Sequence, residues 1–262
     1  MDALVTTEWL ANELSATDLR IVDASYFLSE HGRDAAAEYE AEHIPGAVFM
    51  DLAEIADLSN PLPAMLPAPE KFASRMQSLG LGDGSRIVLY DNSPLHTSAR
   101  AWWMLRTFGA HDVAILDGGL AKWKAEGRAT ASGKESLRHR HFTVWADDKG
   151  VRDLAQMKAN VETGAEQVVD ARSPARFTGE QPDPRPATHA GHIPGSKNLH
   201  YSTLFNADGT WKSADDLKAA FDRADVDLAQ PIVATCGSGI TAGVVVFAAH
   251  LLGNNAALYD GA

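Results

Sequence analysis

The sequence predicts an α/β protein made of two tandem copies of one domain, each a mainly parallel sheet flanked by helices. Three observations support this fold class. The chain has 262 residues, enough for two domains of ordinary size. Its sequence landmarks occur twice in the same order, and short apolar strands alternate with helix-like stretches in both halves.

The internal repeat consists of four landmarks in each half of the chain. The first half contains IVDAS (21–25), AEHIPGAVFMDL (41–52), RIVLYD (86–91) and VAILDGGL (113–120). The second half contains VVDARS (168–173), HAGHIPGSKNLHY (189–201), PIVATC (231–236) and ALYDGA (257–262). Because the spacing between landmarks is also nearly equal, we interpret the chain as a domain at 1–128, a polar linker at 129–149 and a second domain at 150–262.

Strands and helices are expected to alternate within each copy. The apolar strands are IVDA, RIVLYD and VAILD in the first copy and QVVDA, PIVATC and AALYD in the second. This alternation predicts parallel sheets buried on both faces. Helices are expected at four places, because these segments follow a strand and a polar loop or show capped amphipathic spacing: 68–80, 98–108, 213–225 and 241–252. The first copy continues into a short helix, AKWKAEG, whereas the second copy should lack this terminal helix because it stops at YDGA.

Composition excludes several classes of function. Thirty-five acidic against 23 basic residues leave a formal net charge of −12, which argues against a nucleic-acid-binding or membrane-anchoring surface. The N-terminus lacks the basic-then-apolar order of a signal peptide, so we expect a cytoplasmic protein. A single cysteine excludes an internal disulfide, an iron–sulfur cluster and a multi-cysteine zinc site. The pairs His189/His192 and His139/His141 have the proximity of metal ligands, but no carboxylate–cysteine pattern accompanies them, so no metal site is expected. No cofactor is expected either.

The single cysteine, Cys236, is the main candidate for a catalytic residue. A lone cytosolic cysteine is most often a buried apolar side chain. Here, however, two nearby glycines let backbone N–H groups turn inward, and a predicted helix begins directly afterwards, so the loop should stabilise an anion. A thiolate held in this way is a nucleophile. The candidate catalytic loop is Cys236, Gly237, Ser238, Gly239, Ile240 and Thr241.

These landmarks resemble the rhodanese-like sulfurtransferases, specifically the two-domain 3-mercaptopyruvate enzymes. The resemblance is carried by HIPGA (43–47), SARAWWMLRTFG (98–109), LDGGLAKW (116–123), GHIPG (191–195) and CGSGIT (236–241). The family loop is Cys-Gly-Ser-Gly-Val-Thr in mercaptopyruvate enzymes and Cys-Arg-Lys-Gly-Val-Thr in thiosulfate enzymes, so this loop matches the first with Ile240 in place of Val. The resemblance implies two rhodanese-like domains, of which the first is non-catalytic because Asp91 stands at the cysteine position.

The resemblance also implies a reaction and a substrate pocket. The Cys236 thiolate would take sulfur from 3-mercaptopyruvate, release pyruvate and pass the sulfur to a thiol, cyanide or a thioredoxin-like acceptor. The Ser238 and Thr241 hydroxyls can donate to the thiolate or persulfide, although Thr241 could equally cap the helix. Arg176 and Arg185 match the family's two carboxylate-binding arginines, a role that suits the guanidinium fork.

Some family features are absent, and alternatives stay open. Ala64, in the segment NPLPAMLP (60–67), stands where bacterial members usually carry a relay histidine, so this relay is unavailable here. A thiosulfate sulfurtransferase and a non-catalytic persulfide-carrying or binding module are the two alternatives. A Cys-dependent phosphatase is disfavoured, because its Cys-x5-Arg pattern would require arginine at Ala242.

Overall fold

The computed structural model describes residues 1–182 and 190–261 and divides into two compact units. The first unit comprises Met1–Asp147 with Ala207–Trp211, and the second comprises Asp148–Asn206 with Lys212–Ala262. Most of the expected linker, 129–149, therefore clusters with the first unit. The domain limits of 1–128 and 150–262 remain a prediction from the sequence.

The first unit contains a five-stranded, entirely parallel sheet. Its strands occur in the order β1 (Leu4–Val5), β5 (Val113–Leu116), β4 (Arg86–Tyr90), β2 (Leu19–Asp23) and β3 (Ala47–Phe49). The central strand β4 is buried from Ile87 to Tyr90, as expected for a strand covered on both faces. The helical elements are α1 (Thr7–Glu13), η1 (Ser29–His31), α2 (Ala35–Ala41), α3 (Leu52–Ile55), α4 (Pro69–Ser78), α5 (Ser98–Thr107) and α6 (Gly119–Ala125).

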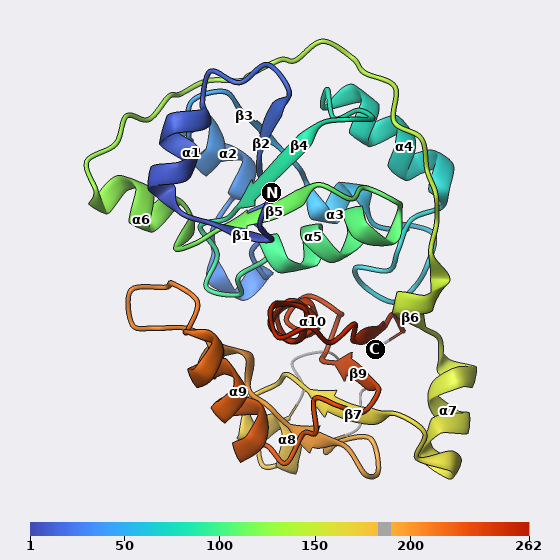
Figure 1. Ribbon diagram of the computed structural model, residues 1–262. Helices are drawn as coiled ribbons and strands as arrows, with labels where there is room; N and C mark the ends of the chain where they lie inside the picture. The colour runs from blue at the N-terminus through green and yellow to red at the C-terminus, as the bar shows by residue number, and fades with distance from the viewer. Residues whose placement is uncertain (183–189, 262) are drawn as a thin grey trace. The chain divides into compact units, whose positions relative to one another are not determined.

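The second unit repeats this architecture (Figure 1). Its parallel sheet has the order β6 (Val151–Arg152), β10 (Ala257–Tyr259), β9 (Ile232–Thr235), β7 (Gln167–Asp170) and β8 (Lys197–Asn198). The helical elements are η2 (Asp148–Gly150), α7 (Leu154–Thr163), α8 (Pro174–Thr178), η3 (Tyr201–Leu204), α9 (Ala214–Arg223) and α10 (Ala242–Leu251). The α/β fold class and the internal repeat are thereby confirmed.

The two sheets correspond strand by strand, so β9 occupies in the second unit the central place that β4 occupies in the first. Helix α5 follows β4 through one loop, and α10 follows β9 through the equivalent loop. Helix α6, which follows β5, has no counterpart after β10 within the described residues. Ligands of open α/β sheets bind beyond the carboxyl ends of the strands. A binding site is therefore expected at the loops that follow the two central strands.

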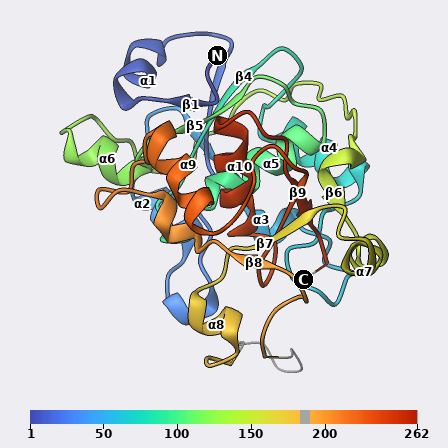
Figure 2. The ribbon, with the colours of Figure 1, turned by 60° about the horizontal axis from the view of Figure 1, so that its bottom comes forward.

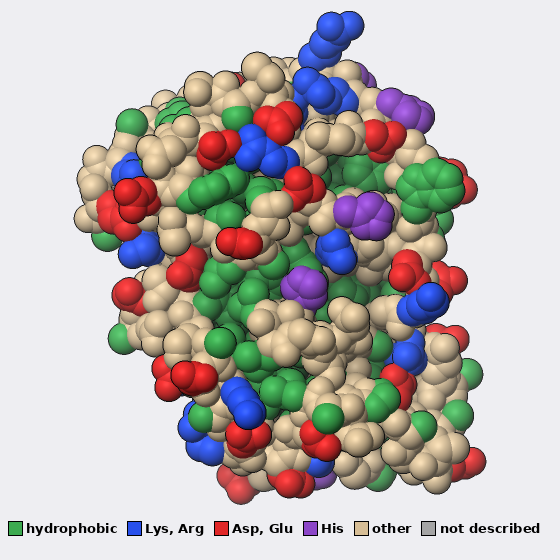
Figure 3. Space-filling view, viewed as in Figure 1, with side chains coloured by type: hydrophobic (Ala, Val, Ile, Leu, Met, Phe, Trp, Pro, Cys, Tyr) green, Lys and Arg blue, Asp and Glu red, His purple; other side chains and the backbone are tan. Residues whose placement is uncertain are grey.

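Helix α10 is apolar around its whole circumference. Every residue from Ala242 to Ala249 is buried, and the helix packs against β9 and β10. Among the described residues, 1–182 and 190–261, no helix has both the length and the apolar character needed to cross a membrane. Acidic and basic side chains are interspersed on the face shown in Figure 3 rather than gathered into patches of one sign.

Candidate active site

Cys236 lies directly after β9, at the carboxyl end of the central strand of the second sheet. Its side chain is a free thiol and is largely buried, with 8% of the residue exposed. Ile240 is also buried and anchors the far end of the loop, whereas Gly237 and Ser238 are partly exposed. The loop is thus buried at Cys236 and again at Gly239 and Ile240, and it is partly exposed between them.

The backbone N–H groups of this loop have no hydrogen-bond partner among the residues that the structure describes. Within residues 1–182 and 190–261, none of the N–H groups from Gly237 to Ala242 donates a hydrogen bond. The first N–H groups of α10 that do so belong to Gly243 and Val244, at 3.1 Å. Gly239 adopts φ +75°, a left-handed conformation that turns the chain at little cost only for glycine. Successive free N–H groups at the start of a helix form an anion-binding site.

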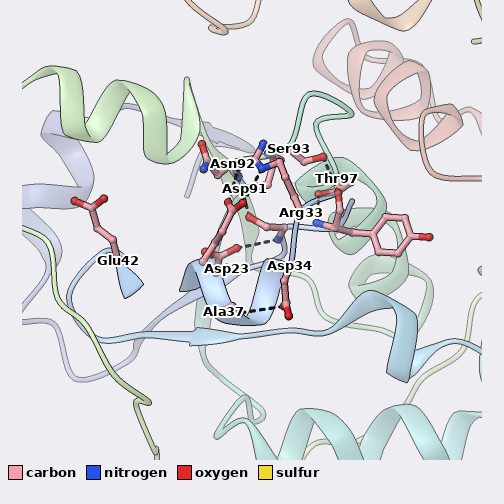
Figure 4. Close-up of polar contacts among 12 residues, drawn as sticks. Asp23, Arg33, Asp34, Ala37, Glu42, Asp91, Asn92, Ser93 and Thr97 are labelled. Atoms are coloured by element: carbon pink, nitrogen blue, oxygen red, sulfur yellow. Dashed lines mark hydrogen bonds and ion pairs between the residues drawn. The ribbon is translucent and has the colours of Figure 1, made fainter. Parts of the chain in front are cut away.

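Asp91 occupies the corresponding place in the first unit and shows what such a loop binds. One carboxylate oxygen of Asp91 accepts the N–H of Ser93 at 3.0 Å (Figure 4). The other accepts the N–H of Ser98, the first residue of α5, at 2.8 Å. The Asp91 side chain is buried, so these charge-assisted bonds replace water. A fixed anion therefore fills the first loop, at the position where the second loop carries the Cys236 sulfur.

The strand next to each loop also ends in a buried aspartate, but the two aspartates have different partners. In the second unit, the buried Asp170 forms a bidentate pair with Arg172, whose Nε donates to Oδ1 at 3.1 Å and whose Nη2 donates to Oδ2 at 2.6 Å. In the first unit Ser25 stands in the place of this arginine, and its N–H donates to Asp23 at 2.9 Å. Burial raises the pKa of Asp23 to about 6, and the neighbouring Asp91 adds to the rise.

Asp23→Asn is expected to flatten the dependence of folding stability on pH. A carboxyl group with a pKa of about 6 in the folded state and an ordinary pKa of 3.8 stabilises the folded state at low pH, and this contribution is lost as pH rises through 6. The difference corresponds to about 3 kcal/mol across this window. Urea unfolding between pH 4 and pH 7 measures it, with Asp222→Asn on α9 as the exposed control. Parallel pH curves for wild type and Asp23→Asn would contradict the assignment.

Comparisons with known proteins agree with this geometry. A model of the rhodanese-like domain matches residues 6–126 and again residues 153–262. Human 3-mercaptopyruvate sulfurtransferase is 40% identical over 266 residues, which cover 99% of this chain and 90% of the human one. The chain belongs to the rhodanese-like sulfurtransferase family.

Further relatives of this sulfurtransferase support the same assignment. The 3-mercaptopyruvate sulfurtransferase of Escherichia coli K12 is 39% identical over 260 residues, covering 98% of this chain and 92% of the relative. The crystal structure of SseA from Escherichia coli matches with a TM-score of 0.92 and 37% identity, covering 100% of this chain and 99% of that one. A thiosulfate sulfurtransferase from Cricetulus griseus is 36% identical over 267 residues, covering 99% of this chain and 90% of the relative.

The remaining predicted site residues of the sulfurtransferase lie on several elements. Arg176 is on α8 in the second unit and is partly buried, whereas Arg185 lies outside the described residues. Thr241 is the N-cap residue of α10, and its side chain makes no capping hydrogen bond to the described part of that helix. Ala64 lies in the first unit, where its carbonyl accepts a hydrogen bond from Arg100. Among residues 1–182 and 190–261, no group of three or more potential metal ligands is present.

Two features of the sulfurtransferase were not found from the sequence. One is the raised pKa of Asp23, which depends on burial beside Asp91. The other is a contact between His192 and Phe177, next to Arg176. Both HIPG motifs contain Pro and Gly, which indicate a turn, but this pattern does not predict a contact between the histidine and a residue distant in sequence.

Proposed function

We propose that the chain transfers sulfur from 3-mercaptopyruvate, through a persulfide on Cys236, to a thiol, cyanide or a thioredoxin-like acceptor. The observation that carries the proposal is the pair of N–H bonds to Asp91. The equivalent loop of the second unit has N–H donors with no acceptor among the described residues, and it has a thiol in place of the carboxylate. A thiolate at Cys236, and then a persulfide anion, would take up the same kind of donors.

The chemistry runs through two displacements at sulfur. In the first, the Cys236 thiolate attacks the donor sulfur, the carbon–sulfur bond breaks with its electron pair going to carbon, and the thiol proton of the donor ends on that carbon. The products are pyruvate and a Cys236 persulfide anion. In the second, an acceptor thiolate or cyanide attacks the outer sulfur, the sulfur–sulfur bond breaks and the Cys236 thiolate is regenerated.

The loop can stabilise the negative charge at both stages. Its N–H groups from Gly237 to Ala242 do not need to reorganise, because no protein acceptor within the described residues uses them. The hydroxyls of Ser238 and Thr241 likewise form no hydrogen bond within the part of the chain that the structure describes, so both can donate to the sulfur. The first domain has no sulfur carrier, because Asp91 cannot form a persulfide.

The proposal assigns the donor's carboxylate and carbonyl to Arg176 and Arg185. Guanidinium groups bind a planar carboxylate through two parallel N–H bonds, which gives orientation as well as charge. We place the reaction in the cytoplasm, a reducing compartment in which thiol acceptors stay available.

Thiosulfate is the second candidate donor, because the relatives include a thiosulfate sulfurtransferase. The doubly charged thiosulfate would favour cationic side chains in the loop, and Gly237 and Ser238 supply none. The same thiolate chemistry could still use it, with sulfite as the leaving group.

A side-by-side assay distinguishes the two donors. Pyruvate release from 3-mercaptopyruvate and sulfite release from thiosulfate are measured with cyanide as the common acceptor. We expect kcat/KM to be at least about 10-fold higher for 3-mercaptopyruvate, because only this donor satisfies the arginine fork through a carboxylate. A higher value for thiosulfate would replace the proposed donor, and no release from either donor would refute the proposal.

A further inference from the structure

Helix α8, which carries Arg176, is a single turn that cannot hold its own position. It spans five residues, Pro174–Thr178, and none of them is buried. Figure 2 shows it at the edge of the second unit. Isolated helices shorter than about 12 residues are marginal in water, so this turn depends on contacts with the rest of the unit. The direction of the Arg176 side chain depends on the same contacts.

His192 provides two of these contacts, both to the residue after Arg176. Its Nδ1 lies 2.7 Å from the carbonyl oxygen of Phe177, and in the tautomer with a proton on Nδ1 it donates to that oxygen. Its ring also stacks on the Phe177 ring, with the centroids 3.8 Å apart and the planes 9° apart. One histidine therefore fixes both the backbone and the side chain beside Arg176.

The segment that carries His192 is connected to the sheet by hydrogen bonds. Arg172 donates from Nη2 to the carbonyl oxygen of Gly191 at 2.7 Å. The same guanidinium is held by the buried Asp170 at the end of β7. A continuous set of contacts thus runs from β7 through Arg172 and Gly191 to His192, and from His192 to the helix that carries Arg176.

The first unit contains the same contact in a different setting. His43 Nδ1 lies 2.8 Å from the carbonyl oxygen of Tyr39, and the two rings stack at 4.3 Å. There both residues are buried and four residues apart, so the pair is part of the core. In the second unit His192 is exposed and 15 residues from Phe177. Core packing therefore does not account for the second pair, whose effect is to hold α8.

We propose that His192 is a positioning residue for Arg176, holding its guanidinium in the direction that binds the anionic group of the sulfur donor. The inference rests on the proposed function and adds to it a residue that does not touch the donor. His192 controls donor binding and leaves the sulfur displacement at Cys236 unchanged.

Steady-state kinetics of His192→Ala test this role. We expect KM for 3-mercaptopyruvate to rise about 10-fold, since a misplaced binding group loses its oriented contact, while kcat changes less than about twofold. His192→Asn should recover most of the loss, because its amide can donate to the Phe177 carbonyl, and His192→Phe should recover part of it through the ring stack. His139→Ala, at an exposed site between the repeats, is the control for loss of a histidine. An unchanged KM in His192→Ala, or no recovery in either conservative variant, would overturn the inference.

A double-mutant cycle with Arg176→Ala separates positioning from general structural support. If His192 acts through Arg176, adding His192→Ala to Arg176→Ala causes no further loss of kcat/KM. If the two residues act independently, the losses in free energy add. Additive losses would refute the inference even where the proposed sulfur transfer is correct. The cycle is measured with whichever donor the wild-type chain turns over, so an error in donor assignment is seen separately, in the wild-type assay.

Discussion

Cys236→Ser is expected to abolish persulfide formation and sulfur transfer together. The serine hydroxyl is not ionised near neutral pH, and its oxygen cannot carry a transferable sulfur in place of the thiolate. Activity should fall by at least about 10³-fold, as for loss of any covalent nucleophile. Because the chain contains one cysteine, the mass of the intact protein after incubation with donor reports directly on this position.

The expected mass change is one sulfur atom in the wild type, removed again by a reducing thiol, and none in Cys236→Ser. Asp91→Asn at the corresponding place of the first unit is the matched control, and its adduct should form normally. Sulfur transfer by the Cys236→Ser variant would show that another group accepts the sulfur and that the loop assignment is wrong.

The second large effect is expected from Arg176→Ala and Arg185→Ala. Each substitution removes a charge-assisted hydrogen bond worth about 1.5–3 kcal/mol. The corresponding loss in kcat/KM for 3-mercaptopyruvate is about 10- to 150-fold. Steady-state pyruvate release measures it, and Arg176→Lys should be only partly active, because a lysine keeps the charge but not the planar fork.

Arg223→Ala, at the end of α9, is the control for removal of a surface arginine. It should leave the kinetics unchanged, while both substitutions in the proposed pocket reduce kcat/KM. Wild-type kinetics in Arg176→Ala and in Arg185→Ala would show that the donor carboxylate binds elsewhere.

Much of the fold follows from local sequence patterns. The longer strands, such as RIVLYD and PIVATC, are apolar runs bounded by polar turns, and the two halves carry the same landmarks. The Cys236 loop is also evident locally, because glycines beside a cysteine at the start of a predicted helix indicate an anion-binding turn. These features depend on residues close together in the chain.

The two-residue strands required the tertiary structure. β1, β6 and β8 are too short to show any periodicity, and they exist because they pair with β5, β10 and β7. The order of strands in each sheet likewise joins elements that are distant in sequence. Such pairing depends on which apolar faces can be buried together, which a local pattern does not specify.

The hydrogen bonds and pKa shifts of the sites also depend on the tertiary structure. The sequence identified Asp91 as the residue at the cysteine position, but only the structure shows its carboxylate accepting the N–H of Ser98. Both β2 and β7 end in an aspartate, and the structure shows that burial, with Asp91 nearby, raises the pKa of Asp23. The contact from His192 to Phe177 spans 15 residues.

The sequence by itself determined the repeat and the reactive loop, because these depend on neighbouring residues. Only the tertiary structure decided which donors, charges and rings meet, because desolvation and hydrogen bonding act between groups brought together by folding.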